Sequence, residues 1–320
     1  MVKITPEIDD VFIGHSSWFI YENTLRIYKH YKFAFATVPT ATSHMAFSSY
    51  PGYLESLDDF YLMDSGLAML QTTNGIPNTT LYDAVTPNSL FAWQRVRIAN
   101  ALSRTGKEWF ETVSKCNSGT YNNQYMLINY GLFEANKPLP ENFLWVVEQI
   151  PGYVEGHDVT NVVERGYWGS YNVPAFERIY NASGYPELVA AHGVENSYDL
   201  APRARLFRRD ANSVKDLSDY KAFLRYNNFE NDAIENGDPM WAICSRGDLQ
   251  AQNASPGGCY DTKVANLSMI LGMRAQVING PTYDDLPPFN WKDWPAYAKV
   301  HQGIPDLMQF EWQHMQSELK

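Results

Sequence analysis

The sequence lacks most of the short motifs that identify common enzyme classes. It contains no G-x-S-x-G nucleophile elbow, which argues against an ordinary α/β-hydrolase, and no H-E-x-x-H metalloprotease motif. It has neither a G-x-G-x-x-G dinucleotide motif nor a phosphate-binding P-loop. The three cysteines include no C-x-x-C pair, which argues against a structural zinc site. We therefore expect neither a cofactor nor a metal.

Long apolar runs and an excess of basic charge are also missing. The better apolar runs, such as residues 268–273, are far shorter than the roughly 18–20 residues that a membrane-spanning helix needs. The 25 basic and 36 acidic residues give a net charge of −11, which argues against nucleic acid and anionic membranes as standing partners. We expect a soluble globular protein with no transmembrane segment.

The composition supports one large domain over residues 1–320. Hydrophobic residues make up 45% and aromatic residues 14% of the chain, which is ample for a packed core. There is no repeat, low-complexity tract or Gly/Ser linker to mark a second unit. Strand-like and helix-like runs do not alternate in a regular βαβ rhythm, so we predict an α+β fold with helices covering a mixed or antiparallel sheet.

Local patterns predict several elements. The strand-like runs are residues 124–130, 143–150 and 203–209. The run TPNSLFAWQRVRIANALSRTG predicts a helix with Thr86 as N-cap, Pro87 at its first position and Gly106 as its stop. Two weaker helices are predicted at residues 22–33 and 185–193.

The chain opens directly on strand formers. Val2 and Ile4, then residues 11–13, favour a strand, and Gly14-His15 is predicted to end the second run. No positively charged segment followed by an apolar stretch precedes them, so no secretory signal is visible. Two explanations stay open here: the chain is a piece of something longer, or the strand simply comes first.

Two cysteines and four sequons bear on the compartment. Cys244 and Cys259 bracket a glycine-containing loop that either closes as a disulfide or leaves two free thiols. Four N-x-[ST] sequons predict glycosylation sites and, with the cysteine pair, favour an oxidising, glycosylating compartment. The predicted glycosylation sites are Asn78, Asn181, Asn253 and Asn266.

Ten stretches of the sequence together form a recognisable pattern. They are DVFIGHSSW (10–18), LRIYKHY (25–31), FSSYPG (47–52), LDDFYLMDSGLAMLQTTNG (57–75), NSGTYNNQYM (117–126), EQIPG (148–152), YWGSYNVPAFERIYNASG (167–184), SYDLAPRARLFRRD (197–210), SRGDL (245–249) and GPTYDDLPPFNW (280–291). In this order, and over nearly the whole chain, they resemble the phospholipase B-like family of lysosomal proteins. The segment NSGTYNNQ and the NVPAFE…APRA pair are the most diagnostic.

The resemblance implies a fold and a maturation step. Family members resemble N-terminal nucleophile hydrolases, whose αββα sandwich stacks two largely antiparallel sheets between helical layers. A precursor cuts itself before a cysteine on the first strand, and that cysteine becomes the nucleophile. By the family pattern this cysteine lies about three residues before Met1, so we expect the chain to lack it and the smaller N-terminal fragment. Cys116 is no substitute, because it is internal and has no α-amine.

The resemblance also assigns roles to residues of this chain. Asn172 is expected to donate to the oxyanion of the tetrahedral intermediate, Arg203 to hold the nucleophile end of the site by charge and hydrogen bonds, and His15 to stand beside the nucleophile. Trp18, Thr72 and Thr73 are expected to line the substrate cleft.

His15, Asn172 and Arg203 also have structural interpretations. His15 fits a hydrogen-bonded core histidine, and Asn172 before Val-Pro fits a turn residue. Arg203 fits an ion pair with Asp199.

The resemblance predicts a lysosomal or secreted hydrolase that removes acyl chains from glycerophospholipids. The expected partners are a phospholipid or other acyl substrate and the chain's own N-terminal fragment. An amidase of the same fold and a non-catalytic glycoprotein or fragment are the alternatives.

Overall fold

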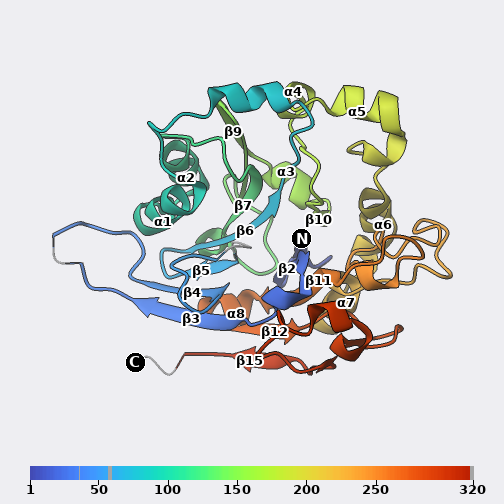
Figure 1. The fold of residues 1–320 in the computed structure, drawn as a ribbon. Helices are drawn as coiled ribbons and strands as arrows, with labels where there is room; N and C mark the ends of the chain where they lie inside the picture. Colours follow the sequence, from blue (N-terminus) through green and yellow to red (C-terminus); the bar gives the residue numbers. More distant parts are fainter. Residues whose placement is uncertain (36, 57–59, 318–320) are drawn as a thin grey trace.

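The computed structural model describes residues 1–35, 37–56 and 60–317 and consists of two stacked sheets with helices outside (Figure 1). Residues 57–59, part of one family-like segment, lie outside the described residues. Within the described residues the α-helices are α1 (Ala92–Leu102), α2 (Gly106–Val113), α3 (Thr160–Val163), α4 (Glu177–Ala182), α5 (Tyr185–His192), α6 (Pro202–Asp210), α7 (Leu217–Leu224) and α8 (Leu267–Leu271).

The larger sheet is a meander in which consecutive strands pair antiparallel from β3 to β9. Antiparallel neighbours of this kind need only short connections. Its strands are β3 (Ile27–Lys32), β4 (His44–Ser49), β5 (Tyr61–Met63), β6 (Leu67–Thr73), β7 (Asn123–Asn129), β8 (Leu144–Ile150) and β9 (Tyr153–Asp158).

The second sheet brings together strands from both ends of the chain. Its order is β10-β1-β2-β11-β12-β15, and every neighbouring pair is antiparallel. Its strands are β10 (Tyr167–Trp168), β1 (Val2–Ile4), β2 (Val11–Ile20), β11 (Gly257–Asn266), β12 (Ala275–Asn279) and β15 (Gln313–Met315). A separate pair, β13 (Phe289–Asn290) with β14 (Leu307–Met308), lies outside both sheets.

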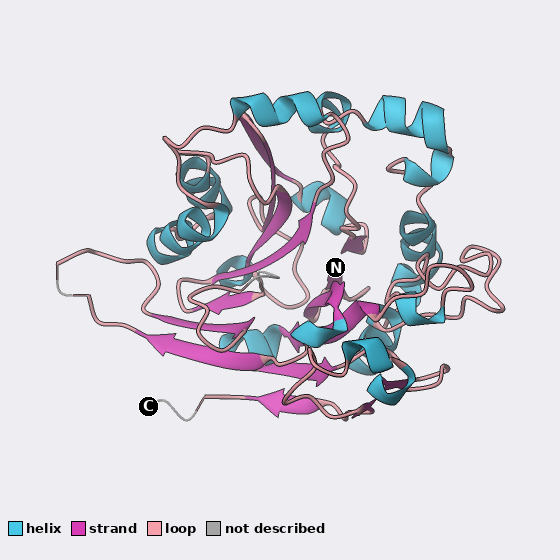
Figure 2. Ribbon diagram, in the orientation of Figure 1, coloured by secondary structure: helices cyan, strands magenta, loops and turns pink. Residues whose placement is uncertain are grey.

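The main core lies between the sheets. Val11 and Ile13 of β2 are fully buried with residues such as Leu70 of the larger sheet in one apolar cluster. Alternate residues of β2 point the other way, where Phe12 packs with Tyr220 and Leu224 of α7. Helices α1 and α2 cover the outer face of the larger sheet (Figure 2), so the predicted αββα sandwich is confirmed.

Three predicted elements are confirmed. The runs at 124–130 and 143–150 form β7 and β8, and both strands are buried for almost their whole length. The run at 185–193 forms α5, which ends at Gly193 with a φ of 100° that favours glycine.

Four local predictions were wrong. The run at 203–209 is α6, a helix with Pro202 in its first turn. The run at 22–33 contains β3, an edge strand whose central residues are only partly buried. The second strand continues beyond Gly14-His15 to Ile20, because β11 pairs with it along its length.

The long helix predicted over 86–106 is also shorter than expected. It begins only at Ala92, and Gly106 opens α2 instead of ending α1. Thr105 caps α2 by accepting from the backbone N–H of Glu108, while the Glu108 carboxylate accepts from the N–H of Arg104. No helix among the described residues is long and apolar enough to cross a bilayer.

Candidate active site

A cavity of about 490 Å³ lies where the amino end of β1 emerges from the smaller sheet. It is lined by residues from both sheets, from the loop after β10 and from α6, and Met1 stands at its wall. All six residues expected at the catalytic and substrate sites line this cavity: His15, Trp18, Thr72, Thr73, Asn172 and Arg203.

Arg203, Asn172 and Thr73 form a hydrogen-bonded chain across the cavity wall. Nη1 of Arg203 donates to Oδ1 of Asn172 at 2.8 Å, and Nδ2 of Asn172 donates to the carbonyl oxygen of Thr73 at 2.6 Å. The amide of Asn172 is thereby fixed in orientation, with its nitrogen toward β6 and its oxygen toward α6. An amide nitrogen carries two hydrogens, so the bond to Thr73 uses only one of them.

Asn172 holds an unusual backbone conformation. Its φ of +69° lies in the left-handed region, where asparagine is tolerated far better than most residues. The hydroxyl of Tyr185 donates to the carbonyl oxygen of Asn172 at 2.9 Å. Side chain and backbone are therefore both anchored, which is typical of a residue whose conformation is fixed by its surroundings.

Arg203 also packs on an aromatic ring. Its guanidinium carbon lies 4.3 Å from the centre of the Trp18 ring, a cation–π contact. Trp18 is itself held by its ring N–H, which donates to the carbonyl oxygen of Ile243 at 3.2 Å. Burial lowers the pKa of Arg203 to about 10, so the guanidinium still carries its positive charge at neutral pH. Asp199 pairs instead with Arg208, at 4.0 Å, which argues against the ion pair considered for Arg203.

His15 stands beside a buried chain of charges. Its Nδ1 lies 3.2 Å from Oγ of Ser17, which accepts a hydrogen bond from Nζ of Lys263. Lys263 pairs with Asp261 at 2.6 Å, and Asp261 also pairs with Arg26 at 2.8 Å. This cluster places a buried ammonium one hydroxyl away from the imidazole.

The amino end of β1 is itself buried. The α-amino group of Met1 donates to the carbonyl oxygen of Gly14 at 2.8 Å, and burial lowers its pKa to about 5. The hydroxyl of Tyr220 donates to the carbonyl oxygen of Met1. An α-amine at this place is therefore neutral, and able to accept a proton, at neutral pH.

Thr72 and Thr73 contribute different groups to the cavity wall. The hydroxyl of Thr72 shares a hydrogen bond with that of Ser170, whereas the backbone carbonyl of Thr73 is the group that meets Asn172. Both threonines end β6, and Thr73 is exposed to solvent.

Glu148 was not assigned a role from the sequence, although it lies within the family-like segment EQIPG. Its carboxylate is fully buried beneath the loop that carries Asn172 and accepts hydrogen bonds from the backbone N–H groups of Ala175 and Phe176. The sequence does contain a signal for Glu148, which is a carboxylate inside the apolar strand FLWVVEQI. A buried carboxylate requires hydrogen-bonding or charged partners, so such a residue is expected to have a specific structural role.

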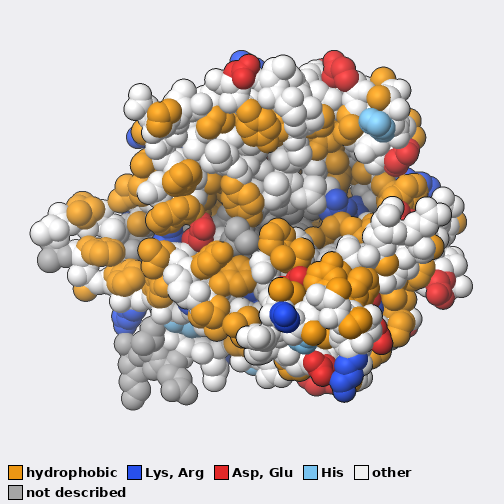
Figure 3. All heavy atoms as spheres, in the orientation of Figure 1, with side chains coloured by type: hydrophobic (Ala, Val, Ile, Leu, Met, Phe, Trp, Pro, Cys, Tyr) orange, Lys and Arg blue, Asp and Glu red, His pale blue; other side chains and the backbone are white. Residues whose placement is uncertain are grey.

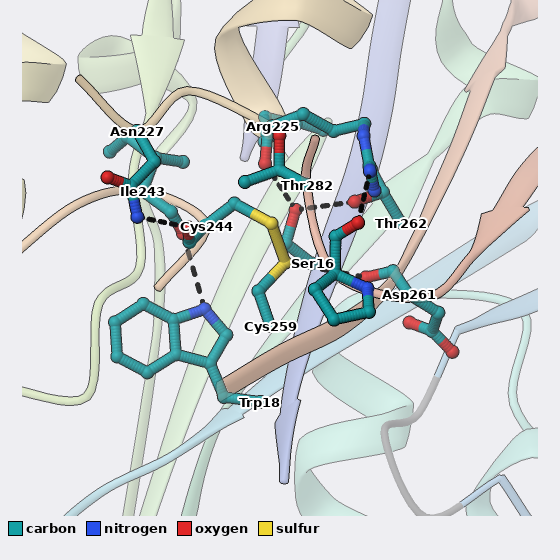
Figure 4. The surroundings of a disulfide bond; sticks show 12 residues. Ser16, Trp18, Arg225, Asn227, Ile243, Cys244, Cys259, Asp261, Thr262 and Thr282 are labelled. Carbon is teal, nitrogen blue, oxygen red and sulfur yellow. Dashed lines mark hydrogen bonds between the residues drawn. A yellow bond between two sulfur atoms is a disulfide. The ribbon is translucent and has the colours of Figure 1, made fainter. Parts of the chain in front are cut away.

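Cys244 and Cys259 form a disulfide, so the open alternative of two free thiols is excluded for this pair, and Cys116 is free and exposed. Figure 4 shows the bridge beside Trp18, whose ring nitrogen points to the carbonyl of Ile243. The bridge thus joins β11 to the loop that holds the Trp18 ring.

The four sequons differ in their surroundings. Asn181 and Asn253 are exposed, Asn181 in α4 and Asn253 in a loop. Asn266 caps α8 through Oδ1 and donates from Nδ2 to Asp10, and Asn78 donates from Nδ2 to the carbonyl of Ala182. The described residues contain no group of three or more His, Cys, Asp or Glu side chains arranged to hold a metal ion.

The two sheets, their helical layers and this cavity define an αββα protein with a polar site at the edge of its core. The sequence pattern of the family described as phospholipase B matches residues 1–315, and the chain belongs to that family. It is 49% identical to phospholipase B-like 1 of Rattus norvegicus over 98% of its length and 56% of the relative's. It is 46% identical to phospholipase B of Crotalus adamanteus over all of its length and 58% of the relative's. The chain thus spans a little over half the length of these relatives.

Solved structures with a related arrangement are distant in sequence. Penicillin V acylase from Agrobacterium tumefaciens is similar with a TM-score of 0.47 and 11% identity, over 87% of this chain and 81% of that one. A variant of conjugated bile acid hydrolase from Clostridium perfringens gives a TM-score of 0.46 and 9% identity, over 99% of this chain and 96% of that one.

Proposed function

We propose that this chain is the larger part of a phospholipase B-type hydrolase that removes acyl chains from glycerophospholipids with an N-terminal cysteine. The observation that carries the proposal is the cavity at the amino end of β1, where His15, Asn172 and Arg203 come together. A hydrolase that works without a cofactor needs a nucleophile, a base and an oxyanion donor, and the cavity supplies places for all three.

The strand register supports the place of the nucleophile. In the pairing of β1 with β2, Val2 lies opposite Ile13 and Lys3 opposite Phe12. If the strand continued for three residues in the same register, the expected cysteine would lie opposite Ser17. Directly opposite residues of an antiparallel pair share a face, so its sulfur would lie on the face of Ser17 and His15, next to the buried ammonium of Lys263.

In this mechanism the thiol attacks the acyl carbonyl carbon while the α-amine takes the thiol proton. The carbonyl oxygen becomes an oxyanion, which accepts from the second N–H of Asn172, and the positive charge of Arg203 stabilises it further. Collapse breaks the ester bond, and the alcohol leaves with the proton from the amine. Water then hydrolyses the thioester, which releases the fatty acid and restores the thiol.

The surroundings of β1 favour this base. An ordinary α-amine has a pKa of about 8, so its neutral form is accessible near neutral pH, and the pKa of about 5 at the Met1 α-amine indicates that burial at this end of β1 favours that form. His15 would hold or relay a proton beside the sulfur.

An apolar surface supports the upstream fragment as a partner. The segment between β3 and β4 projects from the body of the molecule, and Figure 3 shows hydrophobic side chains along it. Phe33, Phe35 and Val38 on this segment are 39%, 57% and 52% exposed. Exposed apolar side chains gathered in this way are typical of a contact surface. The disulfide and exposed sequons support a secreted or lysosomal location.

The test uses the full-length protein, including the residues upstream of Met1. We expect hydrolysis of a diacyl phosphatidylcholine, with fatty acid release that is lost when the upstream cysteine is replaced by serine. Equal release by both proteins contradicts the proposal. A matched N-acyl substrate distinguishes an amidase of the same mechanism, because only the amide is then cleaved. Cleavage of neither substrate favours the non-catalytic alternative.

A further inference from the structure

Glu148 is a buried carboxylate that neutral groups hold in place. It lies in β8 with its side chain fully buried, on the same face as the core residues Leu144 and Val146. Among the described residues no Lys, Arg or His forms an ion pair with it. Burying a carboxylate is costly unless hydrogen bonds replace those lost to water. The groups around Glu148 must therefore supply those hydrogen bonds.

Four neutral N–H groups replace the water. Oε1 accepts from the backbone N–H of Ala175 at 2.7 Å, from Nε2 of Gln124 at 2.7 Å and from Nδ2 of Asn74 at 3.5 Å. Oε2 accepts from the backbone N–H of Phe176 at 3.0 Å. Burial raises the pKa of Glu148 to about 7, and these hydrogen bonds oppose the rise.

These donors belong to the two chain segments that meet at Asn172. Ala175 and Phe176 follow Asn172 in the same loop, so the carboxylate holds that loop from below. Asn74 directly follows Thr73, whose carbonyl accepts from the Asn172 amide. One carboxylate therefore bonds to residues that follow each of the two partners of the Asn172–Thr73 hydrogen bond.

Contacts on both sides of Asn172 hold its left-handed backbone. A φ of +69° is uncommon even for asparagine, and hydrogen bonds to neighbouring groups stabilise it. The Tyr185 hydroxyl fixes the carbonyl oxygen of Asn172, whereas the Glu148 carboxylate binds the backbone N–H groups of Ala175 and Phe176 further along the loop. Glu148 therefore fixes the part of the loop that follows Asn172.

We propose that Glu148 is a positioning residue that sets the direction of the Asn172 amide by clamping residues 172–176 to the end of β6. The inference rests on the proposed function, in which that amide receives the oxyanion. Glu148 does not line the cavity, so it acts on the reaction only through Asn172.

The test compares Glu148→Gln with Glu235→Gln in the full-length protein. Glu235 is a matched control, because it is also fully buried, accepts a backbone N–H at 2.9 Å and has its pKa raised by burial to about 7. Its partner is Asn228, and neither residue lines the cavity. In Glu148→Gln the new amide can accept with its oxygen, but its NH₂ group would face a second backbone donor.

For Glu148→Gln we expect kcat to fall about ten- to hundredfold with KM changed by no more than about twofold. We also expect faster hydrogen exchange of the Ala175 and Phe176 amides. For Glu235→Gln we expect neither change. Equal kcat in the two variants, or unchanged exchange at residues 172–176, overturns the proposal.

If Glu148→Gln does not fold, Glu148→Asp keeps the charge but is one methylene too short to span both segments, and the same readouts apply with the same expected direction. The exchange measurement needs no substrate. If the wild-type protein releases no fatty acid, the proposed function fails, while faster exchange confined to residues 172–176 still supports the clamp and its absence still overturns it.

Discussion

Arg203 donates from Nη1 to Oδ1 of Asn172 at 2.8 Å, although the two residues come from a helix and a loop 31 positions apart. The same guanidinium lies over the ring of Trp18 on β2. One side chain therefore connects α6, β2 and the loop after β10 around the cavity.

Arg203→Lys is expected to lower kcat/KM by about tenfold or more, because an ammonium cannot both donate in a fixed fork and stack on an indole. The measurement is fatty acid release by the full-length protein. Lys107→Arg, on an exposed helix surface, is the control and should be neutral. Retention of full activity in Arg203→Lys would argue that the arginine supplies charge alone.

Asn172→Gly is expected to separate conformation from chemistry. Glycine accepts a φ of +69° freely, so the variant should fold, with a somewhat lower melting temperature because the buried Arg203 guanidinium loses its acceptor. Its kcat should fall about 100-fold, because one oxyanion donor is lost. Asn136→Gly, at another asparagine with a positive φ of 62°, serves as the control for the backbone change alone. Comparable activity in the two variants would remove Asn172 from the proposed mechanism.

The disulfide is expected to contribute to stability. The bridge between Cys244 and Cys259 closes a loop with a sequence separation of 15. Replacing both cysteines by serine should lower the free energy of unfolding by about 2–4 kcal/mol, mainly by freeing the unfolded chain. Urea titration monitored by circular dichroism measures the change. The exposed Cys116→Ser should leave the midpoint unaltered, and an equal loss in that variant would refute the assignment.

Because of Glu235, the protein is expected to be more stable at mildly acidic pH than at neutral pH. Burial raises its pKa to about 7, whereas the carboxyl of an unfolded chain titrates near 4.5. Between these values the folded state binds the extra proton, so stability falls as pH rises through the window. Glu235→Gln should reduce that fall by roughly 1–3 kcal/mol. Urea unfolding of the wild type and of Glu235→Gln at about pH 5 and about pH 7.5 measures the free energy of unfolding. An equal change in this free energy between the two pH values for both proteins would disprove the prediction.

Glycan occupancy should follow the surroundings of the sequons. In protein exported from eukaryotic cells, we expect glycans at the exposed Asn181 and Asn253. Asn266 should stay unmodified, because its amide caps α8 and donates to Asp10. Peptide mass spectrometry before and after glycosidase treatment measures this. A glycan at Asn266 with none at Asn253 would be the opposite result.

The parts of the fold that the sequence predicted are those with one dominant local pattern. Strands β7 and β8 are buried on both faces, so they appear as continuous apolar runs of strand length. Helix α5 has a proline in its first turn and a glycine at its end.

The elements that were missed depend on tertiary context. Strand β3 is a sheet edge with partly exposed residues on both faces, so it shows no period of two. Helix α6 carries five charged residues in nine, which hides the buried Ala204, Leu206 and Phe207. Its proline in the first turn was the signal that was available.

The six cavity residues were singled out from family-like segments, not from periodicity. They lie on β2, on β6, in a loop and on α6, and nothing in their spacing indicates that they meet. Glu148 and Lys263 were missed for the complementary reason. Each looks like an ordinary charged residue in the sequence, and its importance comes only from burial and from partners that are distant in the chain.

The pairing of β1 with β2 has a consequence for maturation. Because side chains alternate along a strand, only residues an odd number of positions before Met1 would point toward the imidazole of His15, and those an even number before would point at α7. If the proposed upstream cysteine is released by a precursor cut, a cut displaced by a single peptide bond would leave a terminus that points to the helical layer instead. Under that proposal, the geometry of one hairpin would decide which peptide bond yields a usable nucleophile.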